Sequence, residues 1–238
     1  MFAAVLLSIS YEALSYDFKL QIITEDLPRW NYLENGELKG FVVDIVKDIK
    51  KRVEDNADIK VMPWAKGYNL LQNEHNVALF TTARSPWREN LFQWVGPVGS
   101  DEWVFVARAD NQIKITSLED AKNVHAIAAY KDDVREQFLR EKGFTNIDVS
   151  LTDQACLNKL LTGRVDLWIQ DELDLKAKIA GQNANVRVVY SIQTIDFYIA
   201  FSKGVPAAVV KEWQDALDAM KKDGVYREIY KKWYGGAG

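Results

Sequence analysis

The sequence predicts an α/β protein built as two lobes. Strand-like apolar runs alternate with segments of helical period along the whole chain, which is typical of βαβ units and a largely parallel sheet. The 238 residues are 48% hydrophobic, with 13 Gly and 5 Pro, so both lobes can bury a core. Two similar blocks, before and after Ala107, follow each other without a flexible linker, so we expect a ligand in the cleft between them.

The first block is predicted from its apolar period. Residues 18–24 alternate apolar and polar side chains as a strand does, and Asn35-Gly36 predicts a tight hairpin turn. Residues 41–55 form a helix whose apolar side chains share one face, namely Val42, Ile45, Val46, Ile49 and Val53. The remaining elements are a strand at 58–62, a helix at 65–72 and an apolar strand at 77–81.

The second block repeats the pattern. Strands are predicted at 103–107, 125–129, 147–150, 165–169, 186–190 and 197–201, and helices at 133–142, 153–161 and 173–180. Ser117 opens a helix-capping pattern, and Gly143 ends a helix. A long amphipathic helix then carries Val209, Val210, Trp213, Leu217 and Met220 at helical spacing, and Gly224 separates it from a segment at 226–234.

Composition excludes several classes of protein. Thirty Lys and Arg against 34 Asp and Glu give a net charge of -4, without the basic excess that binding to nucleic acid requires. Cys156 is the only cysteine, and the two histidines lie far apart, so we expect no intramolecular disulfide, no metal site and no cofactor. The sequence contains no phosphate-binding glycine loop, nucleophile elbow or zinc-protease motif, which favours binding over catalysis.

The N-terminus indicates export. Residues 1–9 are almost wholly apolar, and Ala13-Leu14-Ser15 places small residues where a signal peptidase cleaves. We therefore predict that residues 1–15 are a signal-peptide remnant and that the mature chain is soluble and periplasmic or extracellular. Because no Lys or Arg precedes Lys19, an upstream start codon or a buried N-terminal strand stays an alternative.

Two charged residues are the first candidates for ligand binding. Arg88 follows the end of a strand, where a guanidinium can hold a carboxylate through two hydrogen bonds, although it could equally pair with Glu89. Asp171 ends a buried strand, where it could bind an ammonium group or cap the next helix. The loop residues Trp30 and Trp64 could form aromatic walls of a cleft or cover the core.

The sequence resembles the bacterial extracellular solute-binding proteins of family 3, the amino-acid receptors of ABC transporters. The similarity spans residues 18–235 and is carried by the segments 36–44, 82–89, 163–171 and 232–235. It implies a type II periplasmic-binding fold, with a mixed, mostly parallel sheet in each lobe and two crossing strands as a hinge. The implied division is residues 16–107 for lobe 1, 108–200 for lobe 2 and 201–238 for the return to lobe 1.

The resemblance also implies roles for single residues. Arg88 stands at the position of the family's carboxylate-binding arginine, and Asp171 at that of its ammonium-binding aspartate. Thr81 and Ala83 match loop positions that offer hydroxyl and N–H groups. Glu25 and Trp64 fall near positions that contact the ligand side chain, and Trp30 is a further aromatic candidate.

One departure concerns Asp132-Asp133, where the family usually has Gly followed by Thr or Ser. Carboxylates here would repel a bound carboxylate unless they point away as helix caps. We include Asp133 among the candidate ligand-binding residues. Together with Glu25 and Asp171 it would suit a cationic or amine-bearing ligand.

The expected function is capture of a small polar, amino-acid-like ligand between the lobes and its delivery to an ABC permease. We expect a monomer. Two alternatives stay open: a dehydratase-like enzyme on the same fold, which would need a cleft acid of raised pKa, and a receptor for a signalling partner.

Overall fold

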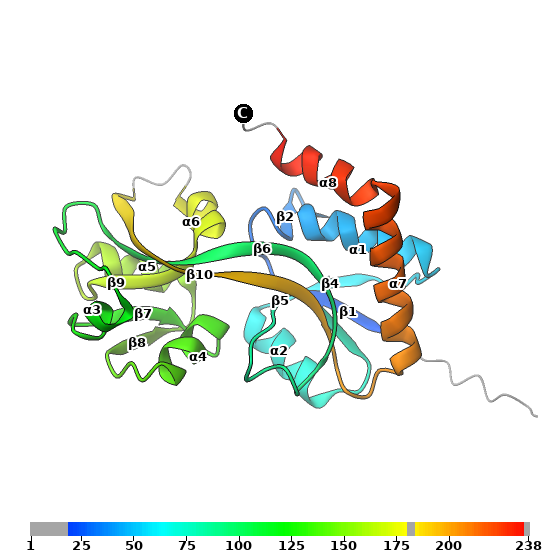
Figure 1. The fold of residues 1–238 in the computed structure, drawn as a ribbon, viewed down its shortest axis with the longest axis horizontal. Coiled ribbons are helices and arrows are strands. Elements are labelled where there is room, and N and C mark those ends of the chain that lie inside the picture. The colour runs from blue at the N-terminus through cyan, green and yellow to red at the C-terminus, as the bar shows by residue number, and fades with distance from the viewer. Residues whose placement is uncertain (1–18, 180–183, 236–238) are drawn as a thin grey trace, which may run out of the picture.

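Two α/β lobes are joined by two long strands, as Figure 1 shows. The computed structural model describes residues 19–179 and 184–235, so the predicted signal segment 1–15 lies outside the described residues. The long strands are β6 (Gln93–Arg108) and β10 (Val186–Phe201), which pair antiparallel from one lobe into the other. This pair is the two-strand hinge that the sequence predicts.

A single mixed sheet runs through both lobes, in the order β4-β1-β5-β10-β6-β9-β7-β8. In lobe 1, β1 (Gln21–Thr24) is parallel to β4 (Ile59–Val61) and β5 (Val77–Ala83). In lobe 2, β7 (Ile127–Tyr130) is parallel to β8 (Ile147–Ser150) and β9 (Leu167–Asp171). Each lobe thus has a parallel set of strands, and the hinge strands run antiparallel beside it.

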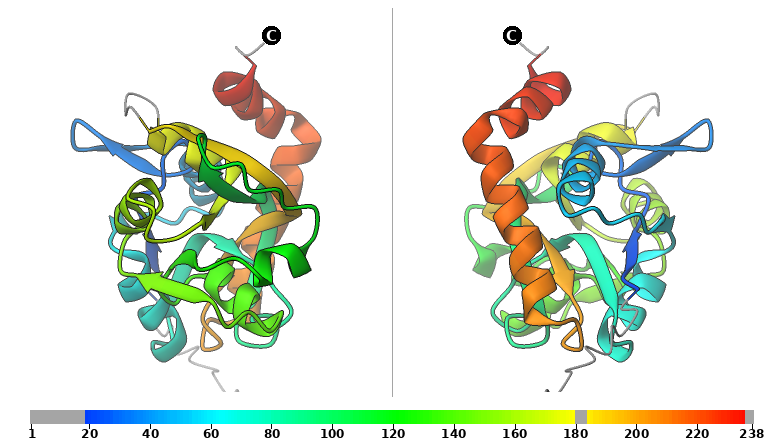
Figure 2. Two further views of the ribbon diagram at one scale, coloured as in Figure 1. Left: turned by 90° about the vertical axis from the view of Figure 1, so that its left-hand side faces the viewer. Right: turned by 90° about the vertical axis from the view of Figure 1, so that its right-hand side faces the viewer.

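The helices of lobe 1 bury the predicted apolar faces. They are α1 (Phe41–Arg52), α2 (Trp64–Asn73), α7 (Ala207–Asp223) and α8 (Val225–Tyr234). Ile45 and Ile49 of α1 and Trp213 of α7 join the same buried cluster. Figure 2 shows α7 and α8 along the flank of the lobe that holds α1, so the C-terminal helices return to lobe 1.

The helices of lobe 2 are α3 (Leu118–Lys122), α4 (Val134–Glu141), α5 (Asp153–Leu161) and α6 (Glu172–Ile179). Ser117 caps α3 by accepting a hydrogen bond from the Asp120 N–H at 3.1 Å, which confirms the capping pattern. Cys156 is fully buried, as a core thiol should be.

One prediction needs correction. The hinge strands are longer than the predicted strands 103–107, 186–190 and 197–201, because polar residues and Gly or Pro at 93–102 and 191–196 resemble loops in sequence. In the structure both segments continue the strands through cross-strand hydrogen bonds; 191–196 is mostly exposed, whereas Val95 and Val98 of 93–102 are buried in the core. Strand β6 begins to pair with β9 of lobe 2 at Trp103. The predicted lobe boundaries at residues 107/108 and 200/201 stay a prediction.

The hairpin between β2 (Tyr32–Glu34) and β3 (Glu37–Lys39) is confirmed. Asn35 and Gly36 both have positive φ, 53° and 81°, as its two-residue turn requires.

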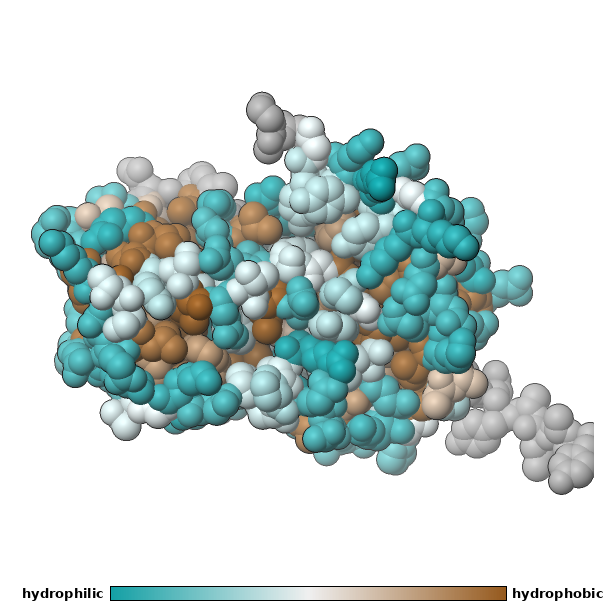
Figure 3. Space-filling view, viewed as in Figure 1, coloured by the Kyte–Doolittle hydropathy of each residue, from teal (hydrophilic) through white to brown (hydrophobic). Residues whose placement is uncertain are grey.

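Hydrophilic residues cover most of the outline of both lobes, and apolar residues group mainly over lobe 2 on the face in Figure 3. Within residues 19–179 and 184–235, no helix combines the length and apolar character needed to cross a membrane.

Gly40 provides a test of how α1 begins. Its φ is 139°, and a Cβ there would lie 2.2 Å from the Trp30 carbonyl oxygen. We expect Gly40→Ala to lower the free energy of unfolding by about 3 kcal/mol or more. Gly143→Ala, at φ 78° with no atom nearby, is the control and should cost about 1 kcal/mol. Urea unfolding measures both, and equal losses would contradict the close contact at Gly40.

Candidate functional site

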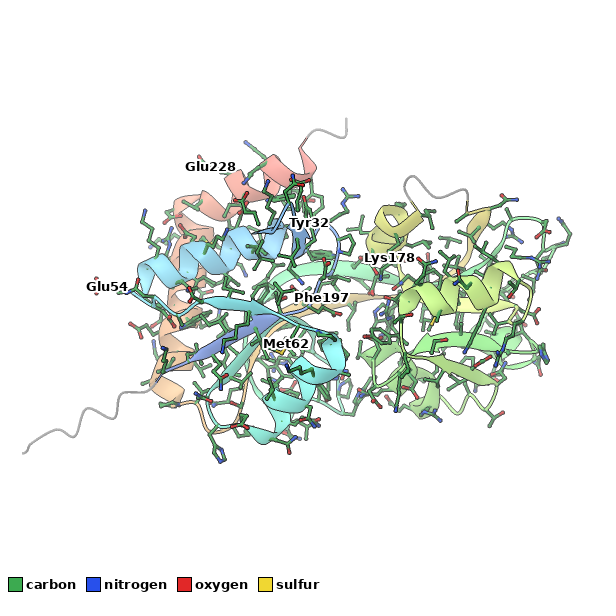
Figure 4. All side chains as sticks on the ribbon, turned by 180° about the vertical axis from the view of Figure 1, so that it is seen from behind. Tyr32, Glu54, Met62, Lys178, Phe197 and Glu228 are labelled. Carbon is green, nitrogen blue, oxygen red and sulfur yellow. The ribbon has the colours of Figure 1, made fainter. Side chains whose placement is uncertain are left out.

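A cavity of about 450 Å³ lies between the lobes. Lobe 1 lines it with Glu25, Asp26, Val61, Met62, Pro63 and Trp64, and lobe 2 with Tyr130, Thr152, Asp153 and Lys178. Figure 4 shows Met62 and Lys178 on opposite sides of the space between the lobes. Most of these residues directly follow β1, β4, β7 or β8, so the cavity lies at the carboxyl ends of parallel strands, where α/β sheets bind ligands.

A larger hollow, of about 900 Å³, lies elsewhere on lobe 1. It is lined by Lys19, Leu20, Gln21, Val53, Asp55, Asn56, Ala57, Asp58, Lys60, Asn76, Val209, Glu212 and Trp213. Because one lobe alone forms it, movement of the lobes cannot enclose a ligand there. The cavity at Glu25 is therefore the better candidate despite its smaller size. A second hollow that both lobes line, of about 470 Å³, lies between Tyr68 and Trp87 of lobe 1 and Asp132 and Gln137 of lobe 2, and it contains none of the predicted ligand-binding residues.

Glu25 is the acid that lobe 1 presents to the cavity. Its side chain is partly exposed to the cavity, yet burial by the surrounding atoms and the charge of Asp133 raise its pKa to about 8. Asn31 fixes the loop by donating to the Glu25 carbonyl oxygen at 2.7 Å, and it accepts a hydrogen bond from the Thr81 hydroxyl. At neutral pH Glu25 therefore carries a proton, which it can release when a cation arrives.

Arg88 lies behind the cavity wall and is fully buried. Its guanidinium stacks on Tyr68, 4.7 Å from the ring centroid, and lies 5.3 Å from the ring of Trp64. Burial lowers its pKa, while Tyr68, Asp133 and Glu25 favour the charged form. Nη1 donates to the Ala83 carbonyl at 3.4 Å, and Nη2 finds no hydrogen-bond partner among the described residues.

The N-terminal part of α4 brings lobe 2 onto Arg88. The Gln137 side-chain oxygen accepts from Trp87 at 2.7 Å and from Arg88 Nε at 3.1 Å. The Trp64 indole N–H donates to the Asp132 carbonyl at 3.4 Å. The lobes are thus already in direct polar contact around Arg88.

Arg135 joins two of the predicted acids. This buried guanidinium donates to Asp133 at 2.6 Å and to Asp171 at 2.7 Å. Asp133 also accepts from the Arg135 backbone N–H and caps α4, as the capping alternative predicts. Although burial opposes ionisation, Arg135 holds the pKa of Asp133 below its usual value. Burial raises the pKa of Asp171, which receives only one of these hydrogen bonds and whose Oδ1 accepts none within the described part of the chain.

Lys178 joins two further acids of lobe 2. Its ammonium pairs with both Asp153 and Asp174. Burial opposes its charge, but these two carboxylates raise its pKa. One oxygen of each carboxylate has no donor within residues 19–179 and 184–235.

The structure places the predicted residues in three groups. Glu25 and Trp64 line the cavity. Arg88, Thr81 and Ala83 are buried behind it in lobe 1, while Asp133 and Asp171 are bridged by Arg135 in lobe 2. Trp30 is separate, because it is 2% exposed and packs in the lobe 1 core against Phe41 and Phe197.

Sequence reasoning missed several residues of the site, namely Asn31, Tyr68, Tyr130, Arg135, Gln137, Asp153 and Lys178. The spacing of Arg135, two residues after a capping Asp, was a usable signal for a local ion pair. The others depend on which loops meet across the lobes. Among the residues that the structure describes, no group of His, Cys, Asp and Glu is arranged to hold a metal ion.

The protonated state of Glu25 predicts a dependence of stability on pH. Its folded pKa, about 8, exceeds the value of 4.5 expected for an exposed Glu. Glu25 holds its proton more tightly in the folded state than in the unfolded state. Its contribution to folding stability is therefore complete below pH 4.5 and is lost as the pH rises toward 8. We expect the unfolding free energy to fall by up to about 1.4 kcal/mol per pH unit in this range, less if cavity solvent screens the carboxylate.

Urea unfolding between pH 5 and 8.5 measures this slope. Glu25→Gln should show a shallower slope than the wild type, with the remainder due mainly to Asp101 and Asp174, whose pKa values burial raises to about 7. Identical slopes would contradict a protonated Glu25.

Comparison with known proteins identifies the family of this chain. Residues 20–236 match the family model of the bacterial extracellular solute-binding proteins, family 3. The chain is 30% identical over 207 residues to the glutamine-binding protein of an ABC transporter of Bacillus subtilis strain 168, covering 84% of this chain and 74% of that protein.

Solved structures of similar fold include binding proteins of this kind. An ancestral arginine-binding protein bound to arginine is similar with a TM-score of 0.78 and 26% identity, covering 90% of this chain and 97% of the other. A histidine kinase sensor domain with similarity to periplasmic binding proteins gives a TM-score of 0.82 at 20% identity, covering 92% and 98%, and this likeness concerns the fold alone. The chain therefore belongs to the bacterial extracellular solute-binding proteins of family 3.

Proposed function

We propose that this chain is a periplasmic solute-binding protein that captures a small polar, amine-bearing solute between its lobes and delivers it to an ABC permease. The observation that carries the proposal is the shared cavity. Glu25 and Trp64 of lobe 1 face Tyr130, Asp153 and Lys178 of lobe 2, so a solute in it contacts both lobes.

The charges around the cavity favour a cation. Glu25, Asp26 and Asp153 line the cavity with three carboxyl groups, and the one lining base, Lys178, pairs with Asp153 and with the buried Asp174. A bound ammonium or guanidinium would favour the ionised form of Glu25 and receive hydrogen bonds from carboxylate oxygens. The rings of Trp64 and Tyr130 add surfaces suited to a cation.

Contact of the solute with both lobes would drive closure of the protein around it. A solute that touches lobe 1 and lobe 2 favours the closed arrangement by its differential affinity for that arrangement. The hinge strands β6 and β10 carry this movement without breaking the sheet. A permease can then distinguish the closed, loaded protein from the open form.

Binding to a panel of amino acids, amines and small carboxylates tests the proposal. A solute at a hundredfold excess over its Kd should stabilise the fold by about 2.7 kcal/mol in a thermal-shift measurement. Glu25→Gln should weaken binding of a cationic solute about tenfold or more, as measured by calorimetry. Glu212→Gln is the control, because Glu212 lines the larger hollow of lobe 1.

Loss of binding in Glu212→Gln with full binding in Glu25→Gln would move the site to that hollow. If no solute of the panel stabilises the protein, the proposal is wrong.

A second candidate function follows from Glu25 alone. A cleft carboxyl whose pKa is about 8 is protonated at neutral pH and could act as a general acid in a dehydratase-like reaction. Incubation with cyclohexadienyl acids, followed by detection of the aromatic product, tests it. Turnover that Glu25→Gln abolishes would favour the enzyme, and the absence of turnover with retained solute binding would favour the receptor.

A further inference from the structure

Four buried charged residues lie together where the N-terminal part of α4 meets lobe 1. Arg88 belongs to lobe 1, and Asp133, Arg135 and Asp171 belong to lobe 2; all are at least nine-tenths buried. Two guanidinium groups and two carboxylates make this cluster electrically balanced. None of the four lines the cavity.

The cluster forms its contacts within the protein. Arg135 lies between Asp133 and Asp171 at hydrogen-bond distance from both. Arg88 donates to Gln137 of α4, and the adjoining Asp132 carbonyl accepts from Trp64. Helix α4, which Asp133 caps, therefore contacts Arg88 directly through Gln137.

An α-amino acid needs two charged partners for its head group: a cation for the carboxylate and an acid for the ammonium. Arg88 and Asp171 are the residues that the sequence predicts for these roles. In this chain Asp133 and Arg88 each favour the charged form of the other, and the guanidinium of Arg135 is bound to both Asp133 and Asp171. The two side chains together reproduce the opposite charges of an amino-acid head group.

The cavity itself offers no second place for a carboxylate. Its one basic lining residue, Lys178, is already held between Asp153 and Asp174. A solute carboxylate would lie beside Asp153, where like charges oppose it, and would oppose the ionisation of Glu25. A solute cation would instead lie beside the carboxyl groups of Glu25, Asp26 and Asp153, and the buried Oδ1 of Asp153 accepts no hydrogen bond in the described part of the chain.

We propose that the solute is an amine or guanidine that carries no carboxylate, because Asp133 and Arg135 occupy the charged positions that an amino-acid head group would need. This inference rests on the proposed function and names its solute class. Asp133 and Arg135 are then specificity-determining residues. They exclude α-amino acids and leave the cavity of Glu25 and Asp153 for a cation.

Matched pairs of compounds test the inference by calorimetry. Cadaverine and L-lysine differ by the α-carboxylate, as do agmatine and L-arginine. The wild type should bind each decarboxylated amine about tenfold or more tightly than its amino acid. Equal or tighter binding of the amino acids would overturn the inference while leaving the proposed function intact. If neither amine binds but another solute of the panel does, the inference alone fails; if no solute binds, both fail.

A double variant tests the role of the two side chains. Asp133→Ser with Arg135→Met removes one acid and one base, so the cluster stays balanced, and Ser can still cap α4. L-lysine and L-arginine should then gain about tenfold or more in affinity relative to the amines. The control is Lys211→Met with Asp215→Ser, an exposed ion pair on α7.

An unchanged preference in the folded double variant would assign the selectivity to the cavity acids and overturn the role of Asp133 and Arg135. Circular dichroism establishes whether the variant is folded. If it is not, the wild-type ratio of amine to amino-acid affinity still decides the solute class.

Discussion

The antiparallel pairing of β6 with β10 is the constraint on which the rest of the molecule depends. It extends from Val186↔Arg108 in lobe 2 to Phe201↔Gln93 in lobe 1, so one continuous sheet holds both lobes. Because β5 pairs with one part of this ribbon and β9 with another, each lobe has its parallel strands beside the hinge. The carboxyl ends of those strands face each other, and the cavity forms there.

Placement at the strand ends has an electrostatic consequence. Loops that follow strands carry polar residues, and those of two lobes bring several acids into a small volume with little solvent. The protein balances most of them internally, with Arg135 between Asp133 and Asp171 and with Lys178 between Asp153 and Asp174. Glu25 forms no ion pair within the described part of the chain, and burial and the charge of Asp133 raise its pKa to about 8 although Lys178 and Arg135 oppose this shift. A cationic solute would supply the missing charge.

The same arrangement explains why relatives of one fold can differ in what they bind. The chain shares its architecture with proteins whose names refer to glutamine or arginine, at 30% and 26% identity. The fold fixes where the loops meet, and in the specificity that we propose a few side chains at the start of α4 and after β1 set the charge that a solute encounters. Asp133 caps α4 and Arg135 lies in its first turn, so a local change in sequence would alter that charge without a change in the hinge.

The sequence by itself determined the elements and the family. Alternating periods predict the strands and helices, because burial of one face requires them, and Asn35-Gly36 predicts its turn from backbone sterics alone. The hinge strands were predicted too short, since their polar middle is stabilised by pairing with a partner about ninety residues away. Only the tertiary structure decided the partners of each charge. Arg135 and Asp171 are 36 residues apart, and an ion pair depends on distance in space, which local pattern does not contain.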